Sequence, residues 1–98
     1  MIHDLKTWPE HFRDVRAGIK TAEIRQNDRN YQPGDALLLR EYDPKAGEYT
    51  GQVETRTVTH VLAGEQYLQP GMVMLSMTGG ERDDRYKSCD YRVQKRTR

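Results

Sequence analysis

The residues with the clearest chemical potential lie in the segment GIKTAEIR, residues 18–25. Lys20, Glu23 and Arg25 place two cations and one carboxylate close together in the chain. A lysine beside a glutamate in a partly buried pocket is a pair suited to acid–base chemistry, and the same pair can hydrogen-bond an amide or the edge of a nucleobase. The competing interpretation is a solvated strand face with weak ion pairs, which the residue types alone favour slightly.

Three further candidates precede a predicted helix, and one follows in a polar loop. Trp8 could stack on a base, although its place in an apolar pattern predicts burial. A lone histidine such as His3 is more often a structural residue than a catalyst, and Lys6 is a possible partner for an anionic group. Arg29 could instead form a loop salt bridge with Asp28. The sequence contains no Ser–His–Asp or Cys–His signature, P-loop or dinucleotide fingerprint.

A helix over residues 9–17 is predicted to stand next to these candidates. Thr7 and Glu10 have the spacing of a capping box, and Gly18 is a natural helix stop. The apolar residues of this helix recur at spacings of three and four, which indicates one buried face. This expected face consists of Trp8, Phe12, Val15 and Ile19.

The remaining segments predict strands. In the segment after Gly18, alternation places Ala22 and Ile24 toward the core and Glu23 and Arg25 on the other face. Leu38 is expected to be buried in a central strand, and the longest strand is expected to bend near Gly51. The order of elements predicts an α+β fold, a small β-barrel of five to six mostly antiparallel strands with one main helix. The expected strands span residues 3–6, 21–25, 36–42, 48–62 and 72–77.

Length and composition limit the possibilities further. The 98 residues suffice for one domain, expected over residues 1–78, and no apolar run is long enough to span a membrane. Residues 79–98 carry seven Lys or Arg and four Asp or Glu, which predicts a basic, disordered tail. Residues 1–78 carry nine Lys or Arg and eleven Asp or Glu, so the net charge of this domain does not attract nucleic acid. A single cysteine, Cys89, suits a reducing cytoplasm, and no metal or cofactor is expected.

Several spaced motifs together resemble the ASCH domains of the PUA-like superfamily. The resemblance covers about residues 2–77. Within the family, the sequence is most similar to a branch of small phage and bacterial proteins of undefined function. The motifs are HDLKTWP at residues 3–9, GIKTAEIR at 18–25, NDR at 27–29, PGD at 33–35, LREYDP at 39–44 and GEYTG at 47–51.

This resemblance implies a PUA-like β-barrel with a cleft beside the helix. Related domains bind RNA or act in RNA metabolism, and some small bacterial members are amidohydrolases that remove the acetyl group from N4-acetylcytidine. Lys20 matches the lysine of those enzymes, Glu23 stands where they have a threonine, and Glu65 is the nearest candidate for their later glutamate.

The combined prediction is an RNA- or nucleotide-binding module with a small polar pocket for a base. One alternative is an amidohydrolase acting on a modified nucleoside, with Lys20 as nucleophile or base and Glu23 as its proton partner. Another is a phage-type accessory protein that binds a host protein, because fold does not fix function. The residues predicted to line the pocket are His3, Lys6, Trp8, Lys20, Glu23, Arg25 and Arg29.

Overall fold

A computed structural model describes residues 1–79. The expectations for the tail over residues 79–98, with Cys89, fall beyond Gly79 and so lie outside the described residues. Within residues 1–79 the chain forms one helix and five strands, and each predicted element is present with its ends displaced by no more than one residue. The elements are β1 (Ile2–Thr7), α1 (Pro9–Arg16), β2 (Ala22–Gln26), β3 (Ala36–Asp43), β4 (Glu48–Ala63) and β5 (Met72–Thr78).

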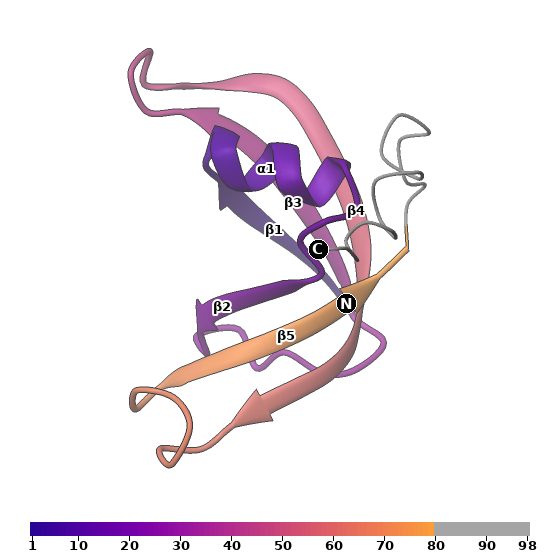
Figure 1. Cartoon of the computed structure of the whole chain (residues 1–98), viewed down its shortest axis with the longest axis vertical. Helices are drawn as coiled ribbons and strands as arrows, with labels where there is room; N and C mark the ends of the chain where they lie inside the picture. The colour runs from indigo at the N-terminus through magenta and orange to yellow at the C-terminus, as the bar shows by residue number, and fades with distance from the viewer. Residues whose placement is uncertain (80–98) are drawn as a thin grey trace, which may run out of the picture.

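The five strands form one sheet in the order β1-β3-β4-β5-β2. β1 runs parallel to β3, and the other pairs are antiparallel. The sheet curves into a half-barrel, and α1 packs against β3 and β4 (Figure 1). The predicted α+β, barrel-like and mostly antiparallel architecture is therefore confirmed. Full closure is not seen in the described part of the chain, because no strand ladder joins the edge strands β1 and β2.

The length of β4 lets one strand serve both halves of the sheet. Its first part pairs with β3 and its last part with β5. Between the pairs Arg40↔Val53 and Tyr42↔Tyr49, β4 has more residues than β3, so the strand bulges there. Gly51 lies in this bulge with a φ of +94°, which glycine adopts at little cost, and the predicted irregularity near this residue is confirmed.

Helix α1 covers the concave side of the sheet with the middle of its predicted apolar face. Phe12 and Val15 are buried as predicted, and Gly18 ends the helix with a φ of +79°. The prediction that Trp8 and Ile19 extend this buried face is wrong. Both residues lie outside α1, and their side chains are 45% and 64% exposed. The core beneath the helix consists of Leu5, Val15, Tyr31, Leu37, Leu39, Val58, Val73, Leu75 and Met77.

The predicted capping box does not form. Trp8 is the N-cap residue, and no side chain caps α1. Thr7 instead belongs to β1, and its extended backbone turns the side chain into the protein, where it is 2% exposed. The helix begins here because Pro9 fixes the backbone of the first turn. Leu38, expected to be buried, is only half-buried, because it points to the convex side of the sheet.

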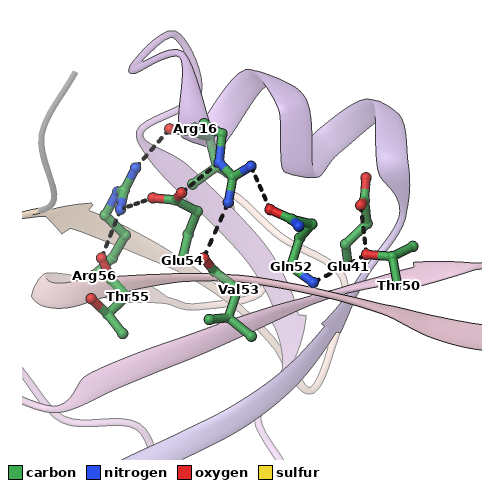
Figure 2. Close-up of polar contacts among 9 residues, drawn as sticks. Arg16, Glu41, Thr50, Gln52, Val53, Glu54, Thr55 and Arg56 are labelled. Atoms are coloured by element: carbon green, nitrogen blue, oxygen red, sulfur yellow. Dashed lines mark hydrogen bonds and ion pairs between the residues drawn. The ribbon is translucent and has the colours of Figure 1, made fainter. Parts of the chain in front are cut away.

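An ion-pair cluster around Glu54 attaches α1 to β4. Arg16, at the end of α1, donates from Nε to Glu54 Oε2 over 2.6 Å, and Arg56 donates from Nη1 to Glu54 Oε1 over 2.9 Å. Arg56 Nη2 also donates to the backbone oxygen of Val15 over 2.8 Å. Figure 2 shows the two arginines meeting the carboxylate between helix and strand. We call Arg16, Glu54 and Arg56 the Glu54 cluster.

Candidate functional site

A cleft of about 470 Å³ opens where the end of β1 meets the start of α1 and the edge strand β2. Residues from four elements and two links surround it, so only the folded chain assembles it. Five of the seven residues predicted for a pocket contribute to this cleft. Its lining consists of Lys6, Thr7, Trp8, His11, Lys20, Ala22, Glu23, Ile24, Arg25 and Met74.

The orientation of β2 is the reverse of the predicted one. Glu23 is 5% exposed and pairs with Leu75, which is fully buried, whereas Ile24 is 57% exposed. The expectation that Ile24 faces the core was therefore wrong. The hydrophobic pattern misleads here because the inward-facing carboxylate is neutralised by partners that the strand pattern does not reveal.

The partners of Glu23 are the other two charged residues of the motif. Lys20 Nζ lies 2.6 Å from Glu23 Oε1. Arg25 donates to Glu23 Oε2 from Nε over 3.1 Å and from Nη2 over 2.9 Å. We call these three residues the Glu23 cluster. Lys20 and Arg25 keep about a quarter of their side chains exposed, so the cluster is open to the cleft while its carboxylate is held in place.

Aromatic and cationic side chains form the rim of the cleft. Trp8 and Tyr42 meet edge to face with ring centroids 6.2 Å apart, and Lys6 Nζ lies 4.2 Å from the centre of the Tyr42 ring. Tyr42 therefore contacts both Trp8 and Lys6 and helps to fix their side chains at the rim. Trp8 remains 45% exposed, which leaves indole surface available to a ligand.

One buried polar atom at the cleft is unsatisfied. The hydroxyl of Thr7 has no hydrogen-bond partner among residues 1–79, although its residue is 2% exposed. An unpaired buried hydroxyl costs stability, so such groups call for an explanation. A bound molecule that hydrogen-bonds this atom would supply one.

Two predicted residues lie away from the cleft. His3 is buried, with Nε2 2.8 Å from Asp35 Oδ2 and its ring 4.6 Å from that of Tyr31. This hydrogen bond, with a second from the Gln32 backbone, holds the pKa of Asp35 below its ordinary value. His3 thus secures the turn before β3. Arg29 donates to the backbone oxygen of Asp4 over 2.6 Å and lines a neighbouring hollow.

Other cleft residues were not found by sequence reasoning. His11, Met74 and Thr7 were given no role in a site, because none belongs to a recognisable motif. His11 comes from the first turn of α1 and lines the cleft together with Trp8 from the link before the helix. Met74 comes from β5 and reaches the cleft because it pairs with Ile24.

The described part of the chain contains no cluster of three or more His, Cys, Asp or Glu side chains placed to hold a metal ion. No helix among residues 1–79 has the length and hydrophobicity needed to cross a membrane.

A curated relative and a family model each match most of this chain. An uncharacterized 12.9 kDa protein from Escherichia phage P2, located in the GpA 3′ region, is 33% identical over 78 residues, which covers 80% of this chain and 70% of the phage protein. The family model for a domain of unknown function, DUF3850, matches residues 2–77. This range includes the whole cleft and all five strands, apart from Thr78 at the end of β5. The chain therefore belongs to the DUF3850 family.

Proposed function

We propose that the cleft binds a nucleobase carried by RNA or by a nucleotide. The observation that carries this proposal is the Glu23 cluster, a buried carboxylate fixed between two cations at the wall of an open cleft. A base edge presents amino donors beside carbonyl acceptors. Glu23 would accept from an amino group, and the ammonium of Lys20 would donate to a carbonyl.

The rim supports the same ligand class. The exposed indole of Trp8 offers a flat apolar surface on which a base can stack, as aromatic side chains do in proteins that recognise unpaired RNA bases. The unsatisfied Thr7 hydroxyl offers one further hydrogen bond. The cleft volume of about 470 Å³ is within the range of small-molecule sites.

The resemblance to ASCH domains enters this proposal as well. A curved, mostly antiparallel sheet with one helix is compatible with a PUA-like barrel, and the lysine motif of that family falls on the cleft wall at Lys20. A reducing, cytoplasmic setting remains part of the proposal. The phage relative is compatible with the separate idea of an accessory protein that binds a host protein.

Binding is favoured over amide hydrolysis by the contacts of Lys20. Its ammonium is ion-paired with Glu23 and also donates to the backbone oxygen of Ala22. A lysine that acts as nucleophile or base must first lose a proton, and both contacts stabilise the protonated form. Lys20 is therefore better placed to donate hydrogen bonds to a ligand than to attack one.

The test uses the fluorescence of Trp8, the only tryptophan in the sequence. The protein is titrated with cytidine, uridine, adenosine, guanosine and N4-acetylcytidine, and we expect saturable quenching by at least one of them. Glu23→Gln should weaken that binding about tenfold or more, because a hydrogen bond to a charged group is lost. Glu54→Gln is the matched control, since Glu54 also lies between two cations but not at the cleft, and it should bind as the wild type does.

Each other outcome selects a different function. Release of acetate from N4-acetylcytidine that disappears in Lys20→Ala would select the amidohydrolase. Failure of every nucleoside and of a short RNA to bind would overturn the proposal and leave the host-protein interpretation. Unchanged affinity in Glu23→Gln would place the site elsewhere in the chain.

A further inference from the structure

A second hollow lies beside the cleft along the gap between β1 and β2. It has a volume of about 360 Å³, and its lining includes Arg25, Asp28, Arg29 and Tyr31. Ile24 and Arg25 line both spaces, so the cleft and the hollow are neighbours along β2. Together they follow the edge at which the half-barrel remains open.

Two arginines bridge this open edge. Arg25 Nη2 donates to the backbone oxygen of Lys6 over 3.0 Å, and Arg29 Nη1 donates to that of Asp4 over 2.6 Å. These bonds take the place of a strand ladder and fix both guanidinium groups relative to β1. Each group is therefore held in position before any ligand binds, which lowers the entropic cost of binding.

The bridging bonds leave donors unused. Among residues 1–79, Nη1 of Arg25 and Nη2 of Arg29 make no hydrogen bond. The nearest carboxylate to Arg29 is that of Asp28, whose Oδ1 is 3.9 Å from Nε, too far for a hydrogen bond. Two fixed guanidinium groups with free N–H donors are suited to bind the oxygens of a phosphate.

The local charge differs in sign from that of the domain. Four cationic side chains and two carboxylates line the two spaces, whereas residues 1–78 as a whole carry two more acidic than basic residues. A cleft whose lining has a net excess of one sign of charge concentrates ligands of the opposite sign. The ligand favoured at this edge is therefore an anion. The cationic residues are Lys6, Lys20, Arg25 and Arg29, and the carboxylates are those of Glu23 and Asp28.

We infer that the second hollow binds the phosphate adjacent to the base held in the cleft, so that the ligand is a nucleotide or a phosphodiester strand and not a free nucleoside. This inference rests on the proposed function of the cleft. It assigns Arg25 to both subsites, with one side on Glu23 and the other toward the phosphate, and it gives Arg29 a role in binding although Arg29 does not line the cleft.

The experiment compares each of cytidine, uridine, adenosine and guanosine with its 5′- and 3′-monophosphates by calorimetric titration. We expect at least one monophosphate to bind about tenfold or more tightly than its nucleoside, since charge-assisted hydrogen bonds to phosphate are among the stronger ones. Arg29→Gln should reduce that difference at least about threefold, with Arg25 still in place, and should leave nucleoside affinity unchanged. Arg13→Gln is the control, because Arg13 is an exposed arginine of α1 that lines neither space.

The outcomes separate this inference from the proposed function. Nucleosides that bind as tightly as all their monophosphates would overturn the inference alone. So would a phosphate gain that is undiminished in Arg29→Gln when the thermal unfolding of this variant is unchanged. Binding of inorganic phosphate or of an acidic peptide with no nucleoside bound at any concentration would overturn the base site as well. Because the first comparison uses the wild-type protein, it does not depend on any variant folding.

Discussion

Two carboxylates in this protein are each held by two cations, yet they lie in different surroundings. Glu54 is enclosed between α1 and β4, where Arg16 and Arg56 connect it to both elements (Figure 2). Glu23 lies on the edge strand β2, and its two ionic partners come from its own segment. Its cluster reaches another element only through Arg25, which donates to the backbone oxygen of Lys6 in β1. The first arrangement fixes a helix, and the second leaves charged groups available at a cleft.

The electrostatics of the Glu54 cluster agree with a structural role. Burial raises the pKa of Glu54, but hydrogen bonds from Arg16 and Arg56 outweigh that effect and hold the pKa below its ordinary value. Arg56 is 7% exposed and donates to the helix backbone at Val15, so its charge is committed to the packing of α1. Similar ion pairs can therefore serve packing or binding, depending on whether their cations are committed to holding a helix and on what space lies beside them.

The largest expected effect separates the two clusters by stability. Arg56→Met removes hydrogen bonds to Glu54 and to the backbone oxygen of Val15, and we expect the free energy of unfolding to fall by about 3 kcal/mol. Lys20→Met removes a cation that is about a quarter exposed and leaves Glu23 paired with Arg25, so it should cost only about 1 kcal/mol. Urea denaturation measures both values. Equal losses would show that the Glu23 cluster is as structural as the Glu54 cluster.

A smaller effect concerns pH. Because the pKa of Glu54 is lower in the folded protein than its ordinary value of 4.5, Glu54 stabilises the fold above that pH and loses its contribution as the pH falls through the folded value. Glu54→Gln should therefore be less stable than wild type by about 1.5 kcal/mol at neutral pH. The two proteins should converge in stability as the pH falls below the folded pKa of Glu54. A constant difference across the acid range, measured by thermal unfolding, would show that the charge of Glu54 contributes nothing.

The smallest effect tests whether the cleft is built for a ligand. Thr7→Val removes a buried hydroxyl that has no partner in residues 1–79, so stability should stay the same or rise by about 1 kcal/mol. Affinity for the base should fall. Thr50→Val is the control, because Thr50 of β4 donates to Glu41 Oε1 of β3 over 2.8 Å at an exposed site away from the cleft. A clear loss of stability in Thr7→Val, with affinity unchanged, would mean that this hydroxyl serves the fold.

Much of the fold could be predicted because local patterns agree with it. Proline at the start of α1, Gly18 at its end and the alternation that marks strands each act over a few residues. The tertiary structure keeps the elements that these signals predict, although it reverses the two faces of β2. Phe12 and Val15 were predicted correctly for the same reason. Trp8 was not, because it lies in the link between β1 and α1, where helical periodicity no longer decides which way a side chain points.

The candidate site was only partly predictable. The motif placed Lys20, Glu23 and Arg25 close together in the chain, and the structure brings them together with Lys6 and Trp8 at one cleft. The sequence could not identify Thr7 or Met74 as cleft residues, because their positions depend on how β1, α1 and β5 meet. The sequence also could not show that His3 lies away from the cleft, because its partner Asp35 comes from a turn that is distant in the chain.

By itself, the sequence determined the order, type and limits of the elements and the concentration of charge in residues 18–25. Only the tertiary structure decided which face of β2 turns inward. Hydrophobicity alone would bury Ile24, but pairing with β5 places Glu23 opposite the buried Leu75, and the flanking cations make that burial tolerable. Burial of a charge depends on partners in three dimensions, which an alternating pattern along one strand cannot specify.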